Sequence, residues 1–158
     1  MISPQGGSRL LQAATGRRAA LDSMVFIYHL AADDRYAPLV APLFRMWESG
    51  GGSATASVLA VLEILVGPLR AGGSKEAAEV VRALSVFPNL AFLPVTLEIA
   101  ERAAEIRARH AVRTPDAIHI ATALVSGAEI FLTNDRDFER MDEIDVLVLE
   151  DFVAPVSS

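Results

Sequence analysis

Four acidic residues stand alone in apolar or turn-forming stretches spread along the whole chain. They are Asp22, Glu63, Asp116 and Asp135. Glu63 is the clearest case, because it interrupts the apolar run SVLAVLEILVGPL, where it has no nearby charge partner. A lone carboxylate in an apolar segment costs free energy unless something compensates for it. Four such residues at the ends of predicted elements suggest one shared site, and a shared acidic site suggests a divalent metal ion.

The chemistry of such a site follows from its charge. Two carboxylates about 5 Å apart repel each other by roughly 3 kcal/mol at an effective dielectric constant near 20. Mg²⁺ or Mn²⁺ would relieve this repulsion and activate a water molecule, and two ions about 4 Å apart would hold both sides of a phosphodiester. The chain has no cysteine, which excludes thiolate ligands, and its three scattered histidines argue against a histidine-rich site. Oxygen ligands favour Mg²⁺ or Mn²⁺.

Each acid taken alone has a simpler explanation. Asp116 would favour the positive end of a helix dipole, and Asp135, in the sequence TNDRD, would serve a turn. Asp22 would cap the helix that follows it. Glu63 has the weakest explanation of this kind, so the set of four outweighs its members.

The elements that must position these acids alternate along the chain from Ala19 onward. Strands are predicted at residues 19–22, 53–56, 90–95, 129–133 and 145–149. Helices are predicted at 23–30 and 38–48, and after caps at Ser57, Ser74, Thr96 and Thr114, ending near residues 67, 86, 111 and 126. Strands separated by helices indicate an α/β fold with a parallel sheet covered on both faces. Ligands of such sheets gather outside the carboxyl ends of the strands, where the four acids would converge.

Length and composition limit the classes of protein to which the chain can belong. The chain has 158 residues, which fits one domain; residues 1–18, rich in Gly, Ser, Gln and Arg, are expected to be a tail before a domain at 19–158. With 52% hydrophobic residues and a mean hydropathy of +0.36, the chain can bury a substantial core. No apolar run approaches the ~18 residues of a membrane span and no secretory signal is evident, so a cytoplasmic protein without membrane contact is expected. The net charge of −6 argues against broad, nonspecific nucleic-acid binding and leaves room for a local basic patch.

Four segments resemble the four acidic motifs of the PIN domain, in the right order. They are ALDSMVFIY, SVLAVLEILVGP, RTPDAIHIATAL and FLTNDRDF, and the resemblance runs from about Ala19 to Phe152. The third segment is especially similar to the toxin-type branch called VapC. Two departures stand out: Ser23 occupies a position where Thr is more usual, and the N-terminal segment is longer than in the usual toxin.

The resemblance implies a three-layer α/β/α fold with a central parallel sheet, Mg²⁺- or Mn²⁺-dependent endoribonuclease activity, a homodimer, and neutralisation by a small antitoxin. It also assigns the site. The metal-binding catalytic acids would be Asp22, Glu63, Asp116 and Asp135, with Asp137 as a fifth metal ligand. Ser23 would orient Asp22, and Thr133 and Asn134 would support the acids.

Two arginines, one histidine and one apolar helix face lie outside the acid set. Arg113 and Arg136 are the better candidates for RNA contact, since both are close in sequence to site acids. His119 lies one turn after Asp116, where a packed histidine is favoured over a proton shuttle. The face formed by Leu39, Leu43 and Trp47 is read as core, with dimer or antitoxin contact as the alternative; we expect the helices around 39–47 and 57–66 to supply the dimer surface.

Two other functions compete with the nuclease. One is a PIN-like protein that no longer cleaves and serves as a binding or regulatory module; an intact acid set argues against it. The other is a phosphatase-like hydrolase with an Asp nucleophile. Such enzymes place a second Asp two residues after the first, and the sequence Asp22-Ser23-Met24 lacks it.

Overall fold

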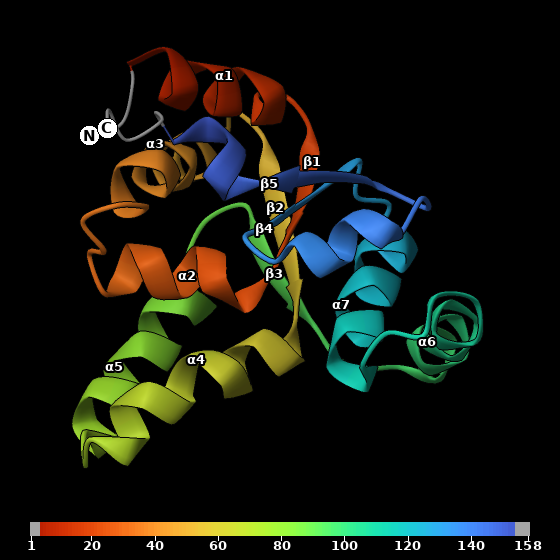
Figure 1. Ribbon diagram of the computed structural model, residues 1–158. Coiled ribbons are helices and arrows are strands. Elements are labelled where there is room, and N and C mark those ends of the chain that lie inside the picture. The colour runs from red at the N-terminus through yellow and green to blue at the C-terminus, as the bar shows by residue number, and fades with distance from the viewer. Residues whose placement is uncertain (1–3, 154–158) are drawn as a thin grey trace, which may run out of the picture.

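The computed structural model describes residues 4–153 and is built on a five-stranded, fully parallel sheet (Figure 1). The strands are β1 (Arg18–Leu21), β2 (Ser53–Ser57), β3 (Leu90–Leu93), β4 (Ile130–Thr133) and β5 (Asp145–Val148). Their order is β3-β2-β1-β4-β5. The chain moves outward from β1 to β3 and then crosses back to β4 on the other side of β1. The strand order therefore reverses between β1 and β4, and ligands bind at the carboxyl end of such a switch point. The predicted α/β fold and its parallel sheet are confirmed.

Helices cover both faces of the sheet. They are α1 (Pro4–Ala14), α2 (Ser23–Leu30), α3 (Ala37–Glu48), α4 (Val58–Arg70), α5 (Ser74–Ser85), α6 (Leu97–His110) and α7 (Thr114–Val125), with the short 3₁₀ helices η1 (Arg136–Arg140) and η2 (Leu149–Phe152). Side chains alternate along β1: Ala19 and Leu21 join the core under α1, α2 and α3, while Ala20 joins the core under α6 and α7. Figure 1 shows these two layers, with α4 and α5 extending from the first. No helix within residues 4–153 has the length and hydropathy to cross a bilayer.

The N-terminal segment differs from the expected tail, because it contains the 11-residue helix α1. Leu10 and Ala14 are fully buried and belong to the same core as α3. Gly6 lets the helix approach η2 closely: a Cβ there would lie 2.1 Å from the carbonyl oxygen of Phe152. The glycine that suggested a flexible tail is thus explained by close packing.

Helix boundaries follow the predicted caps in two cases out of four. The hydroxyls of Ser57 and Thr96 accept hydrogen bonds from the backbone N–H groups of Leu59 (3.1 Å) and Ile99 (3.2 Å). Ser74 and Thr114 are instead the first helical residues, after Gly73 and Arg113. A further prediction was wrong: α4 continues past Pro68 to Arg70. A proline in the last turn removes only one helical hydrogen bond, so the helix tolerates it there.

The apolar face of α3 is core. Leu39, Leu43 and Trp47 are each at most 1% exposed. This confirms the core interpretation and corrects the expectation that this face contributes to a dimer or antitoxin surface, because its apolar area is already covered inside the chain. On α4, by contrast, Val58, Leu62 and Leu69 are 45%, 60% and 53% exposed.

Candidate metal centre

Asp22 lies at the carboxyl end of β1, at the switch point of the sheet, and is 7% exposed. Its Oδ1 accepts a hydrogen bond from the backbone N–H of Ser23 (2.7 Å), which caps α2. Its Oδ2 accepts one from the hydroxyl of Thr133 at the end of β4 (2.7 Å). The simple helix-capping role foreseen for Asp22 is therefore present, and the contact with Thr133 comes in addition. The carboxylate is fixed by the start of α2 and by the end of β4, the strand next to β1.

The electrostatics of Asp22 are those of a buried acid beside another acid. Burial is the largest effect and raises its pKa; the imidazole of His119 and the hydrogen bonds from Thr133 and Ser23 lower it, and the charge of Glu63 raises it again. The net direction is upward. An ionised Asp22 is thus held at a free-energy cost that a nearby cation would reduce.

Glu63 projects from α4 towards α7 and contacts His119. The His119 Nε2 and Glu63 Oε1 atoms are 2.6 Å apart. This hydrogen bond is the main reason that the pKa of Glu63 is lowered, against the opposing effect of burial; the Ser23 hydroxyl and the charge of Arg113 add to the lowering. His119 was predicted to be a packed histidine, and it is buried at 3% exposure, but it also touches a predicted site acid.

Asp116, in the first turn of α7, is 9% exposed and is held by Arg113 through two contacts. Arg113 Nε lies 3.2 Å from Asp116 Oδ2, and Arg113 Nη2 lies 3.4 Å from Oδ1. Asp116 is the main reason that the pKa of Arg113 is raised, and the charges of Asp135 and Asp137 contribute in the same direction. Arg113, whose side chain is 76% exposed, therefore stands among three acids at the surface.

Asp135 and Asp137 lie in the turn after β4. Asp135 accepts a hydrogen bond from the backbone N–H of Asp137 (2.9 Å) and donates its own backbone N–H to the Thr133 hydroxyl (3.0 Å). Thr133 thus joins Asp135 to Asp22. Asp137 is 65% exposed and accepts a hydrogen bond from Arg140.

Asn134, predicted to support the acids, and Arg136, predicted to contact RNA, have other partners. Asn134 donates a hydrogen bond to the Tyr28 hydroxyl and accepts one from the backbone N–H of Glu150, and neither partner is a site acid. Arg136 forms ion pairs with Glu139 and Asp151. Its charge is therefore balanced by two carboxylates, which argues against the predicted contact with RNA.

The predicted acids interact as two groups rather than as one cage. Asp22 and Glu63 form one group with His119, while Asp116, Asp135 and Asp137 surround Arg113, whose charge also reaches Glu63. Within residues 4–153, no three of these acids bring ligand atoms within 4.8 Å of one another. Arg113, the residue before α7, contacts Asp116, and His119, on α7, contacts Glu63.

The donor set fits a hard divalent cation. Carboxylate oxygens from four different elements, without any thiolate, suit Mg²⁺ or Mn²⁺. Asp22 supplies the observation that favours a cation, because burial raises its pKa and leaves its charge without full compensation. For Asp116 to join it, the two contacts from Arg113 would have to open.

A second cluster lies away from these acids, at the end of α6, and was not foreseen from the sequence. His110, Asp142 and Glu143 bring ligand atoms within 4.8 Å of one another. His110 Nε2 is 2.8 Å from Glu143 Oε1, and Arg109 Nη1 is 3.0 Å from the same oxygen. Two basic side chains therefore already balance this carboxylate, and Asp142 is 87% exposed. The arrangement is an ion-pair network that ties α6 to the loop before β5.

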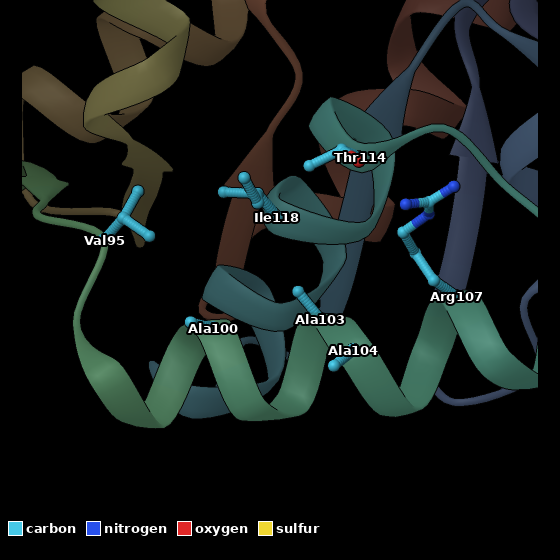
Figure 2. Close-up of a pocket in the computed structure, with 7 residues that line it drawn as sticks. All are labelled: Val95, Ala100, Ala103, Ala104, Arg107, Thr114 and Ile118. Atoms are coloured by element: carbon cyan, nitrogen blue, oxygen red, sulfur yellow. The ribbon is translucent and has the colours of Figure 1, made fainter.

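The groove in Figure 2 lies between α6 and α7 and is mostly apolar. Ala100, Ala103 and Ala104 line one side and Ile118 lines the other. None of the residues that line it carries a carboxylate. The groove is therefore distinct from the acidic region at the switch point.

The sequence pattern that contains the acids is shared with a known protein family. The model of the PIN domain matches residues 19–144, which include all five predicted acids. No curated protein sequence matches.

Several solved structures share the fold. One is a toxin–antitoxin complex from Klebsiella pneumoniae, at 21% identity and a TM-score of 0.62 over 83% of this chain and 97% of that one. Another is the DNA-bound VapBC of Salmonella typhimurium, at 19% identity and a TM-score of 0.67 over 84% and 98%. A third is Mycobacterium tuberculosis VapC20, described as a toxin that cleaves the sarcin–ricin loop, at 21% identity and a TM-score of 0.57 over 72% and 86%. At these identities the likeness establishes the fold.

Proposed function

The chain belongs to the PIN domain family, and from this we propose that it is a divalent-metal-dependent endoribonuclease that hydrolyses RNA phosphodiesters as the toxin of a toxin–antitoxin pair. The observation that carries the proposal is the meeting of motifs from distant parts of the chain at one sheet edge. Asp22 is bonded to Thr133 and interacts with Glu63, and Thr133 is bonded in turn to Asp135. VapC20 and the Klebsiella complex support a toxin with the same fold.

We assign the catalytic role to Asp22, Glu63, Asp116 and Asp135, with Asp137 as an additional metal ligand. These residues would hold Mg²⁺ or Mn²⁺, which would supply Lewis-acid chemistry for phosphodiester hydrolysis. Asp22 offers both carboxylate oxygens in an orientation set by Ser23 and Thr133. Arg113 is an exposed cation in contact with Asp116 and would contact an RNA phosphate once released from it.

The partners follow from the same family. We propose a small antitoxin protein, an RNA substrate, a homodimer and a cytoplasmic location. The exposed apolar residues of α4, namely Val58, Leu62 and Leu69, are the surface that we assign to the dimer. We place the nuclease domain at residues 19–158, with α1 as an N-terminal addition packed on it.

A catalytically silent PIN-like binding module is the second candidate. One observation favours it: Arg113 contacts both carboxylate oxygens of Asp116, so a basic side chain already balances an acid that a metal ion would need. The complete acid set remains the stronger argument for catalysis.

The test is cleavage of single-stranded RNA by the purified chain in Mg²⁺ or Mn²⁺, with EDTA, single-stranded DNA and a phosphomonoester as parallel arms. We expect RNA cleavage that stops in EDTA and returns when metal is added back. Absence of cleavage with either metal would favour the silent module. Faster turnover of the phosphomonoester than of RNA would indicate a phosphatase.

A further inference from the structure

His119 is a buried polar residue on an otherwise apolar helix face. It is 3% exposed, and its α7 neighbours Ala117, Ile120 and Ala121 are completely buried. A polar group at such a position costs free energy unless a hydrogen bond compensates for it. Its ring makes that bond to a predicted site acid, with Nε2 2.6 Å from Glu63 Oε1.

The direction of this hydrogen bond follows from the atoms involved. A carboxylate ion only accepts hydrogen bonds, so Nε2 must carry the hydrogen. The other ring nitrogen, Nδ1, is buried and has no hydrogen-bond partner among the described residues. The imidazole is thus positioned by packing on one side and directed at Glu63 on the other.

His119 also lies within the electrostatic reach of the second acid in this group. Burial has the largest effect on the pKa of Asp22, and His119 has the largest effect in the opposite direction. Since α7 also carries Asp116 one turn earlier, one helix presents an acid and the donor that holds another acid. Carboxylates that ligate metals are generally oriented by such outer hydrogen bonds, and losing one typically reduces metal affinity or activity about 10–100-fold.

We propose that His119 is a positioning residue of the metal centre: its Nε2–H holds the Glu63 carboxylate in the orientation in which it faces Asp22 and binds the metal ion. The inference rests on the proposed function and adds a residue that is not one of the acids. His119 itself would touch neither metal nor RNA.

The variants His119→Phe and His119→Gln test this assignment. Phe preserves the ring shape and removes the donor, whereas Gln places an amide N–H near the Nε2 position. Titration with Mn²⁺ in a calorimeter should show about 10–100-fold weaker binding for His119→Phe and binding within about threefold of wild type for His119→Gln. RNA cleavage by His119→Phe should require correspondingly more Mn²⁺, with the KM for RNA unchanged.

Thr122→Val is the matched control. Thr122 lies one turn further along α7, is 1% exposed, and bonds through its hydroxyl to the backbone carbonyl of Ile118 in its own helix. Its variant should bind Mn²⁺ as wild type does. Wild-type Mn²⁺ affinity in His119→Phe, or equal losses in His119→Phe, His119→Gln and Thr122→Val, would overturn the proposal.

A measurement on the unaltered protein covers the case in which His119→Phe does not fold. Nitrogen-15 NMR of the histidine rings should show the His119 hydrogen on Nε2, with a resonance that shifts when Mg²⁺ is added. A hydrogen found on Nδ1 alone would refute the contact. If the wild-type protein neither binds Mn²⁺ nor cleaves RNA, the proposed function fails, whereas the NMR result still decides whether His119 holds Glu63.

Discussion

Among single residues, the carboxylates of the candidate centre are balanced in different ways. Glu63 has the imidazole of His119, and Asp116 has the guanidinium of Arg113. Asp22 has hydrogen bonds but, within residues 4–153, no direct contact with a cation, and burial raises its pKa. Asp22 is therefore the acid whose charge costs the metal-free protein most.

Replacing Asp22 with Asn should leave the metal-free protein equally stable or more stable, by up to about 1 kcal/mol. The change removes a buried negative charge that interacts unfavourably with Glu63, while the amide oxygen can still accept one of the two hydrogen bonds. Thermal unfolding in EDTA provides the measurement. A loss of several degrees in the melting temperature would show that the carboxylate mainly supports the start of α2.

The ion pairs of Glu143 should give the protein a defined dependence on acid pH. Burial works to raise the pKa of Glu143, but the hydrogen bond from His110 and the charges of His110 and Arg109 outweigh it, and the pKa lies below the ordinary 4.5. A carboxyl group whose pKa is lowered by folding stabilises the protein above its unfolded-state pKa. That contribution disappears as the pH falls through the folded-state pKa.

Glu143→Gln should therefore lower the free energy of unfolding by about 1–2 kcal/mol at pH 7 and by less at pH 3. Urea denaturation at both pH values would measure this. Glu105→Gln is the control, because Glu105 is 60% exposed in a surface pair with Arg102 and should matter little at either pH. An equal effect of Glu143→Gln at pH 3 and pH 7 would contradict the assignment.

Among the elements, α1 is the one whose contribution is least evident from sequence. Leu10, on α1, is fully buried in the core that it shares with α3. Leu10→Ala should therefore reduce the free energy of unfolding by about 3 kcal/mol. Leu97→Ala is the matched control, since Leu97 is 77% exposed. A loss below about 0.5 kcal/mol for Leu10→Ala would mean that α1 is dispensable for stability.

The helix α4 carries the dimer prediction. Leu62 is 60% exposed on a helix whose other exposed apolar residues are Val58 and Leu69. Leu62→Glu should shift a homodimer towards monomer in analytical ultracentrifugation at micromolar concentration. Ser8→Glu, which adds the same charge on the exposed side of α1, should leave the dimer intact. Wild-type protein that sediments as a monomer would contradict the proposed homodimer.

Element types were predictable where the local signal was strong. The strands β1 to β5 and the helices α2 to α7 match apolar runs and periodic segments, and caps with a hydroxyl before an extended helix, such as Thr96, were found at the correct residue. The helix α1 was missed because its glycines resemble a linker, and only the contact of Gly6 with Phe152 explains why one of them is there. Such a reason lies 146 residues away in the sequence and cannot be read locally.

For the molecule as a whole, the sequence located the acids but not their basic partners. The positions of Asp22 and Asp135 at strand ends follow from the parallel sheet, and the β1–β4 switch point brings their loops together through Thr133. The contact of His119 with Glu63 depends on how α4 and α7 pack, and the contact of His110 with Glu143 spans 33 residues. Periodicity alone carries no information about either pair.

Single-turnover cleavage of single-stranded RNA in saturating Mn²⁺, compared between wild-type protein and Asp22→Asn, shows whether RNA cleavage depends on a metal ion held by these acids. Asp34→Asn, at an exposed site, serves as the control that removes one charge elsewhere. We expect cleavage by wild type and Asp34→Asn, and for Asp22→Asn only the background seen in EDTA. Cleavage by Asp22→Asn at the wild-type rate, or by wild type undiminished in EDTA, would contradict this expectation.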